Sequence, residues 1–234
     1  MPMSPPNWHK QKRRWPSVSK SATESSRVNE TKAETFSAAV AALRRGDVIA
    51  FPTETLYGLG ADALNAAAVN KVFQLKGRDF ANPIPVLVAD RDMLGTLVAE
   101  VPPLAERLIA NFWPGPLTLV LSARKGVAEP LLNSSGGVGV RISDQSIATE
   151  LAKALGYPIT ATSANPSGQA PARTVAQARQ YFAGKIEVFV DGGELNSKTG
   201  STVAEVVGDT IRVVREGEIS RTELEQAVGK GKVL

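Results

Sequence analysis

Residues 51–60 read Phe-Pro-Thr-Glu-Thr-Leu-Tyr-Gly-Leu-Gly and follow an apolar run, Val48 to Ala50. The apolar run is typical of a strand. We expect the strand to end at Pro52, because proline supplies no ladder donor and restricts the residue before it. In the hydroxyl-rich loop that follows, Gly58 and Gly60 permit a close approach of the backbone to a ligand. The stretch therefore predicts a ligand-binding loop at the end of a strand.

The rest of the body alternates helical and extended patterns. Helices are expected over residues 35–45, 65–77, 102–112, 144–155, 174–182 and 220–228, with a further helix opening at Asp90. Strands are expected over residues 47–51, 84–89, 117–122, 138–143, 158–163, 186–191, 201–207 and 210–215. Several strands are apolar almost throughout, which implies cover on both faces. These patterns predict one α/β domain over residues 34–234 with a mixed β-sheet flanked by helices.

Residues 1–33 have a different composition, rich in Pro, Ser, Lys and Arg and poor in aliphatic residues. Such a segment cannot bury enough apolar surface to offset its ordering entropy, so we predict a disordered basic N-terminal extension. Its first part, up to Lys20, loosely resembles an organellar transit peptide but lacks a clean amphipathic pattern. The alternative is a dispensable extension.

The net charge of +4 belongs to this extension. The chain has 27 Lys/Arg and 23 Asp/Glu, and residues 1–33 hold seven of the basic and two of the acidic residues, leaving 20 basic and 21 acidic residues for the body. A basic protein is a candidate for nucleic-acid binding. Here the near-neutral body gives that interpretation little support.

The inventory of reactive side chains is narrow. The chain has no cysteine, which excludes disulfides and thiolate chemistry, and its single histidine, His9, lies in the extension. A Ser-His-Asp triad or a histidine-rich zinc site in the body is therefore excluded. No apolar run approaches a membrane span, and we expect a cytoplasmic protein with no membrane partner. The remaining Lys, Arg, Ser, Thr, Tyr and carboxylates suit chemistry on phosphates by positioning and charge neutralisation.

Three local patterns could bind a ligand, and each has an ordinary structural explanation. The strand at 138–143 places Gly137, Gly139, Arg141 and Ser143 on one face, which leaves room for a ligand or forms an exposed edge. Lys76 and Arg78 flank Gly77, where they can bind a polyphosphate or complement a helix dipole. Ser163-Ala164-Asn165 follows a strand, as ligand-binding loops and ordinary turns both do. No Walker motif, G-x-G-x-x-G or acidic metal cluster is present, so a nucleotide site would be of another design.

Taken together, these patterns and others in the same order resemble a known family over residues 35–228. The matching pieces are residues 52–60, Lys76-Gly77-Arg78, Asn82-Pro83, residues 113–118, Val140-Arg141, Ser163-Ala164-Asn165, Asp191-Gly192-Gly193, Ser201-Thr202-Val203 and Arg215-x-Gly217. The chain resembles the YrdC-like L-threonylcarbamoyladenylate synthases. Nine motifs in the right order favour the functional interpretation of each over the structural one.

The resemblance implies a single YrdC-like catalytic domain with a twisted mixed sheet around a deep concave cleft. It implies that L-threonine, bicarbonate and ATP, with Mg²⁺, give threonylcarbamoyl-AMP and pyrophosphate. That product would pass to a separate threonylcarbamoyl transferase complex that modifies adenosine in tRNA. Longer members carry an additional C-terminal domain, which we do not expect after the last helix here.

The resemblance also assigns residues. Thr53, Thr55, Tyr57, Arg141 and Ser201 are expected to bind threonine, with Arg141 on its carboxylate. The family's Lys-x-Arg and Ser-x-Asn signature maps onto the candidates for catalysis and ATP phosphate binding, Lys76, Arg78, Ser163 and Asn165. Asn82 and Arg215 are expected to complete the ATP site, and no metal-ligating residue is assigned.

Three departures bear on the detail of threonine and bicarbonate binding. Asp79 stands where many members have proline, Leu87 where many have a histidine near threonine, and residues 141–145 read Arg-Ile-Ser-Asp-Gln instead of Arg-x-Pro-x-His. Two alternatives stay open. One is a non-catalytic module that binds double-stranded RNA or tRNA, and the other is a paralogue that binds nucleotide without threonine activity.

Overall fold

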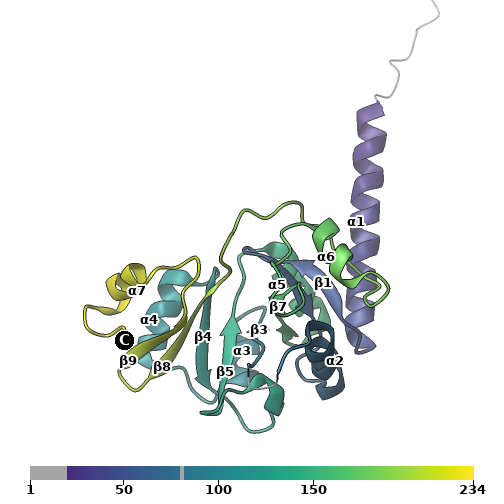
Figure 1. The fold of residues 1–234 in the computed structure, drawn as a ribbon. Helices are drawn as coiled ribbons and strands as arrows, with labels where there is room; N and C mark the ends of the chain where they lie inside the picture. Colours follow the sequence, from purple (N-terminus) through teal and green to yellow (C-terminus); the bar gives the residue numbers. More distant parts are fainter. Residues whose placement is uncertain (1–19, 80–81) are drawn as a thin grey trace, which may run out of the picture.

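The structure, a computed structural model, describes residues 20–79 and 82–234. Its described strands form two sheets, one of three strands and one of six, covered by helices (Figure 1). The predicted α/β class with mixed pairing and flanking helices is confirmed, although the strands divide between two sheets instead of one.

The small sheet contains the stretch that opened the sequence analysis. Strand β1 (Ile49–Pro52) pairs antiparallel with β2 (Tyr57–Gly60), and β2 pairs antiparallel with β7 (Thr162–Ser163). The prediction that 53–60 is a loop was therefore wrong beyond Leu56. Gly60 pairs with Ile49 in this sheet, and a side chain at this position would press on the ring of Phe51, because a built Cβ lies 2.7 Å from Phe51 Cε1.

The large sheet has the strand order β6-β3-β5-β4-β8-β9. Its members are β3 (Val86–Leu87), β4 (Leu117–Ser122), β5 (Gly137–Arg141), β6 (Ile159–Thr160), β8 (Thr202–Val207) and β9 (Thr210–Arg215). The β3–β5 and β4–β8 pairs are parallel and the others antiparallel. One continuous strand was predicted over 158–163, but the chain leaves the large sheet after Thr160 and joins the small sheet at Thr162.

Helix caps agree with the sequence. Asn65 caps α2 (Ala66–Lys76), which ends at Gly77 in the left-handed conformation, and Asp90 caps α3 (Arg91–Leu97). Pro103 begins α4 (Pro103–Phe112), and Gln145 caps α5 (Ser146–Leu155). Thr174 and Ser220 cap α6 (Val175–Phe182) and α7 (Arg221–Val228), the latter with a capping box to Glu223.

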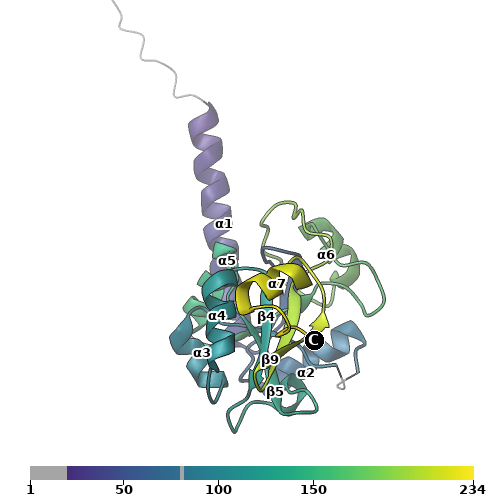
Figure 2. The same cartoon turned by 90° about the vertical axis from the view of Figure 1, so that its left-hand side faces the viewer.

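Helix α1 (Lys20–Arg44) projects from the body in both views (Figures 1 and 2). The sequence predicted this helix only from residue 35, so it crosses the predicted boundary at residues 33–34. Residues 1–19 of the predicted disordered extension lie outside the described residues, and the division into extension and domain stays a prediction. Near its end, α1 packs on α5 and β1 through Ala39, Val40 and Leu43.

Residues 186–191, predicted as a strand, form only two isolated bridges, Phe189 with Ala50 and Ile186 with Ala183. Two clusters of buried apolar side chains form the core, the larger around the large sheet and the smaller between α1, α5 and β1. Within the described ranges, no helix is both long enough and apolar enough to cross a bilayer.

Candidate active site

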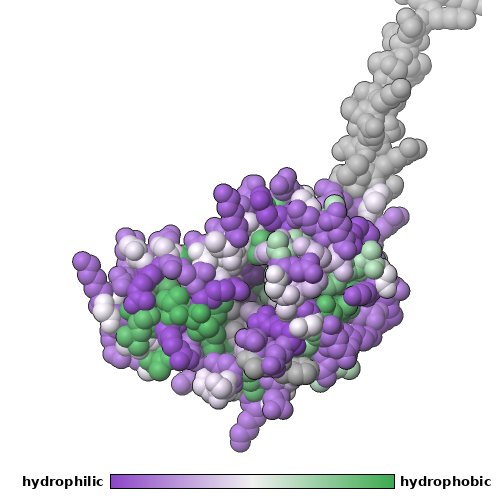
Figure 3. Space-filling view, viewed as in Figure 1, coloured by the Kyte–Doolittle hydropathy of each residue, from purple (hydrophilic) through white to green (hydrophobic). Residues whose placement is uncertain are grey.

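A cavity of about 620 Å³ is lined by residues of both sheets. Figure 3 shows a hollow between the part of the molecule built on β8 and β9 and the part that contains β7 and α6. Its wall on β4, β5 and β8 combines apolar side chains with glycines, Val120, Gly137, Gly139 and Val203. The glycine face predicted for residues 138–143 therefore faces the cavity, where Arg141 shares it.

Besides Arg212, which pairs with Glu205, three arginines line this cavity: Arg141 from the end of β5, Arg78 from the loop after α2 and Arg215 from the end of β9. Burial lowers the pKa of all three, and for Arg215 the positive charges of Arg141 and Arg78 lower it further. Anions are the ligands that such a cluster favours.

Arg141 is almost fully buried and is paired with a carboxylate. Its Nη1 donates to Glu54 Oε1, and Ser143 Oγ donates to the other oxygen of Glu54. Nη1 also lies 3.5 Å from Thr55 Oγ1. Its Nε and Nη2 make no hydrogen bond to any described residue, so one edge of the guanidinium can serve a ligand in the cavity.

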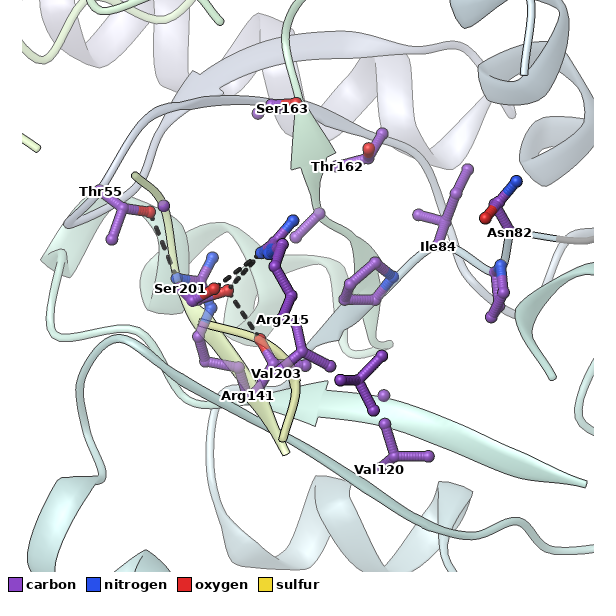
Figure 4. A pocket seen from close by; sticks show the side chains of 18 of the residues that line it. Thr55, Asn82, Ile84, Val120, Arg141, Thr162, Ser163, Ser201, Val203 and Arg215 are labelled. Atoms are coloured by element: carbon purple, nitrogen blue, oxygen red, sulfur yellow. Dashed lines mark hydrogen bonds between the residues drawn. The ribbon is translucent and has the colours of Figure 1, made fainter. Parts of the chain in front are cut away.

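Arg215 is anchored to the start of β8. Its Nη2 donates to the carbonyl oxygen of Ser201 at 2.8 Å and to Ser201 Oγ at 3.2 Å. Ser201 Oγ lies 3.0 Å from Oγ1 of Thr118, because the parallel β4–β8 pairing brings these residues together. Figure 4 shows Arg215 between Arg141 and Thr162.

Arg78 and Lys76 lie at the opposite side, next to β7. Arg78 Nη1 donates to Thr162 Oγ1 at 3.4 Å. The ammonium of Lys76 is buried and donates to the carbonyl oxygens of Ser163 at 2.6 Å and Asn165 at 2.8 Å. Burial, with a smaller contribution from the charge of Arg78, lowers the pKa of Lys76 to about 8.

Hydrogen bonds from its own side chains fix the conformation of the loop before β2. Thr53 Oγ1 donates to the carbonyl of Leu56 at 2.7 Å and accepts from the backbone N–H of Thr55 and Leu56. The phenol of Tyr57 donates to the carbonyl of Gly193 at 2.8 Å and accepts from the N–H of Gly192 at 2.9 Å. This loop is therefore fixed from within and tied to the 191–193 turn.

The structure brings most of the predicted site residues to one place. The cavity is lined by Thr53, Thr55, Tyr57, Arg78, Asn82, Arg141, Ser163, Ser201 and Arg215. Lys76 and Asn165 do not contribute to the described lining. Instead they hold the loop behind it, where Asn165 Nδ2 donates to the carbonyl of Gln169 at 2.7 Å.

Sequence reasoning gave no role to three further residues, Glu54, Thr118 and Thr162. Each contacts a predicted site residue: Glu54 contacts Arg141, Thr118 contacts Ser201 and Thr162 contacts Arg78. The sequence did offer a signal for such residues. It was a hydroxyl side chain in an otherwise apolar strand, or a carboxylate next to a motif residue.

The predicted Mg²⁺ finds no site of its own in this part of the molecule. No group of three His, Cys, Asp or Glu side chains could hold a metal among the described residues. The two carboxylates near the cavity, Glu54 and Glu205, are each bonded to an arginine, Arg141 and Arg212. The described donors therefore do not fit a protein-held cation.

The family model for the Sua5/YciO/YrdC domain, described as telomere recombination, matches residues 41–217. This chain belongs to the Sua5/YciO/YrdC family.

Two relatives within this family are threonylcarbamoyl-AMP synthases by name. The chain is 38% identical to that of Pyrococcus abyssi over 82% of its own length and 56% of the relative's. It is 42% identical to that of Thiobacillus denitrificans over 64% of its own length and 79% of the relative's. The solved structure of P. abyssi Sua5 complexed with L-threonine superposes with a TM-score of 0.81 at 37% identity, covering 87% of this chain and 59% of that one. The chain thus spans just over half the length of the archaeal relative.

Proposed function

We propose that this Sua5/YciO/YrdC-family chain is an L-threonylcarbamoyladenylate synthase, a nucleotidyltransferase that forms threonylcarbamoyl-AMP and pyrophosphate from L-threonine, bicarbonate and ATP. The observation that carries the proposal is the meeting of Arg78, Arg141 and Arg215 in one cavity with the hydroxyls of Thr55 and Ser201. Such a cavity is suited to hold two anions side by side, a polyphosphate and an amino-acid carboxylate. The names of the relatives support the same activity.

The threonine half lies at Arg141. Its free guanidinium edge faces the cavity and offers a bidentate site for the carboxylate of the amino acid. Thr55 lies beside it, and Tyr57 lines the same cavity. L-threonine is the ligand of the P. abyssi structure, which supports an amino acid here.

The ATP half lies at Arg78, with Asn82 and Ser163 beside it. Arg78 offers a guanidinium to the phosphates. Lys76 lies behind Ser163 and holds the loop that carries it, and its ammonium adds positive charge under the phosphates. No covalent enzyme intermediate is required, which agrees with the lack of cysteine and the absence of histidine from residues 34–234.

The chemistry is a matter of positioning. The neutral amine of threonine and bicarbonate give a carbamate and water, and a carbamate oxygen then forms a bond to the α-phosphorus while the bond to the leaving pyrophosphate breaks. The protein holds the reactants together and stabilises negative charge as it moves to the leaving group. Mg²⁺ would arrive on the ATP phosphates, and no step here depends on residues that bind it.

The product would be consumed by a threonylcarbamoyl transferase complex acting on tRNA. A non-catalytic role in binding tRNA or double-stranded RNA is less well supported, since Arg78, Arg141 and Arg215 line the cavity and the body of the chain is near neutral.

The test incubates the protein with α-labelled ATP, bicarbonate, Mg²⁺ and threonine and measures AMP-containing product and pyrophosphate. Threonine-dependent release of pyrophosphate is expected, and Lys76→Ala should reduce it by orders of magnitude. Turnover that is independent of threonine would reject the synthase. A salt-dependent tRNA shift without turnover would favour the RNA-binding module instead.

A further inference from the structure

We propose that Ser143 is a positioning residue for the amino-acid substrate. Its hydroxyl holds the Glu54 carboxylate on Nη1 of Arg141 and so keeps the other edge of that guanidinium turned to the cavity. The inference rests on the synthase activity proposed above and adds to it a residue outside the described lining of the cavity. Ser143 would act through Glu54 and Arg141 without touching threonine.

The backbone brings Ser143 to the same carboxylate as Arg141. Arg141 ends β5, and Ser143 follows two positions later. Residues two apart in an extended chain point to the same side, and both of these side chains donate to Glu54, in the loop between β1 and β2. Arg141 engages Oε1 and Ser143 engages Oε2, so the carboxylate is held at both oxygens.

The direction of the Ser143 hydroxyl is also set. Its Oγ accepts a hydrogen bond from the backbone N–H of Gln145 at 3.2 Å, which leaves its own proton for Glu54. Ser143 is 1% exposed, and the side chain of Glu54 is 8% exposed, so little water can replace this donor. Loss of the hydroxyl would leave a buried carboxylate oxygen without its partner, which costs more than loss of a surface hydrogen bond.

The position of Arg141 depends on this carboxylate. Two carboxylates attract its guanidinium, Glu54 more strongly and Asp144 less strongly. Asp144 is exposed and follows Ser143 directly. A guanidinium that turned toward Asp144 would take its free edge away from the cavity. With Glu54 held by Ser143, Nη1 stays on Glu54, while Nε and Nη2 can bind a carboxylate in bidentate fashion.

Position 143 is one of the places where this chain departs from the Arg-x-Pro-x-His pattern. A proline there would restrict the backbone through its ring but would offer no side-chain donor. The serine is held instead by its hydrogen bonds with Glu54 and Gln145. The contact that orients the carboxylate is therefore a property of the serine in this chain.

Steady-state kinetics tests the positioning role. Ser143→Ala is expected to raise KM for L-threonine by roughly three- to thirtyfold, as for partial loss of hydrogen bonds to a charged ligand. Its kcat and its KM for ATP should change by less than about twofold, because the carboxylate of threonine is bound equally before and during the reaction. Ser143→Thr keeps the hydroxyl and should restore KM for threonine to near the wild-type value.

Thr160→Val is the matched control. The hydroxyl of Thr160 is buried, bonds only to the backbone of Ala61 and Leu59, and lies outside the described lining of the cavity. This variant should lose stability without a selective rise in KM for threonine. An unchanged KM for threonine in Ser143→Ala, or a rise no larger than that of KM for ATP, would overturn the positioning role.

Nitrogen-15 NMR of the Arg141 side chain separates this inference from the synthase activity itself. The hydrogen bond to Glu54 hinders rotation of Nη1, so separate Nη1 and Nη2 signals are expected in the wild type and in Ser143→Thr. They should merge in Ser143→Ala, and their absence from Arg141→Lys assigns them. Merged signals in the wild type, or separate signals in Ser143→Ala, would overturn the inference whether or not the enzyme turns over. Threonine-dependent turnover of the wild type judges the activity separately.

Discussion

Glu54 and Arg141, 87 positions apart in the chain, form a buried ion pair that joins the two sheets at the cavity. Glu54 follows β1 of the small sheet, and Arg141 ends β5 of the large one. Ser143 donates a hydrogen bond to the second carboxylate oxygen, so both oxygens of Glu54 are engaged. The pair fixes which edge of the arginine faces the cavity.

Removal of Glu54 should therefore weaken both the fold and threonine binding. Glu54→Ala leaves a buried arginine unpaired, and the free energy of unfolding should fall by about 3–5 kcal/mol, measured by urea denaturation. Glu54→Gln keeps a hydrogen-bond acceptor and should lose less stability while raising KM for threonine more than KM for ATP. Glu106→Gln is the control: it breaks an exposed pair with Arg91 and should cost less than about 1 kcal/mol. Wild-type stability in Glu54→Ala would contradict the structural role of the pair.

Tyr57→Phe tests the tie between the cavity loop and the 191–193 turn. The phenol exchanges hydrogen bonds with Gly192 and Gly193, and its loss leaves both backbone groups without this partner. The expected loss is about 1–3 kcal/mol by thermal or urea unfolding. Tyr181→Phe, which removes an exposed hydroxyl bonded to Ala170, should cost less. Equal losses of stability in the two variants would show that the hydrogen bonds of Tyr57 to Gly192 and Gly193 contribute no more than an exposed hydrogen bond does.

Gly217 is predicted to be intolerant of any side chain because it touches the wall that carries Ser201. A Cβ built there would lie 2.4 Å from the carbonyl oxygen of Gly200 and 2.5 Å from the carbonyl carbon of Ser201. Gly217→Ala should displace Ser201, lower stability by about 1–3 kcal/mol and reduce threonine-dependent pyrophosphate release further than that loss explains. Gly95→Ala, in α3 with open space around it, should instead stabilise by roughly 0.5–1 kcal/mol. Normal activity in Gly217→Ala would show that displacement of Ser201 does not affect catalysis.

Lys76 predicts a particular dependence of stability on pH. Its pKa in the folded protein is about 8, below the 10.5 of a free lysine. Between these values only the unfolded chain holds the proton, so the free energy of unfolding should rise with pH by at most about 1.4 kcal/mol per unit across this window. Below about pH 8 the lysine is charged in both states and contributes no slope.

Comparison of two variants isolates that contribution. Lys76→Met should remove the rise between about pH 8 and 10.5 in urea unfolding, whereas Lys153→Met, at an exposed site on α5, should retain it. If Lys76→Met kept the wild-type increase in the free energy of unfolding with pH, that increase would belong to other groups.

Apart from the start of α1, the sequence predicted the helices and their ends best, because local signals determine them. Asn65, Asp90, Thr174 and Ser220 each cap a helix as expected, since a cap needs only a side chain and the backbone next to it. The two-sheet arrangement was missed because it depends on contacts distant in sequence. The switch of sheets at residue 161 has no local mark beyond a run of strand-like residues.

The site was predicted as a set of residues, but their partners were not. The glycine–arginine face of β5 follows from simple alternation and does face the cavity. The Lys-x-Arg spacing predicted two phosphate ligands, whereas the structure places Arg78 at the cavity and Lys76 on the carbonyls behind it. Whether the charged end of a lysine or arginine side chain reaches a cavity depends on packing, and the spacing of residues in the sequence does not show it.

The crowding of Arg78, Arg141 and Arg215 has a consequence for solution behaviour. Mutual repulsion among these guanidinium groups lowers the stability of the ligand-free protein, and any small oxyanion that enters the hollow relieves it. Sulfate or inorganic phosphate should then raise the melting temperature by mass action and compete with ATP. The choice of buffer salt should therefore change the apparent affinity of this cavity for the proposed nucleotide substrate.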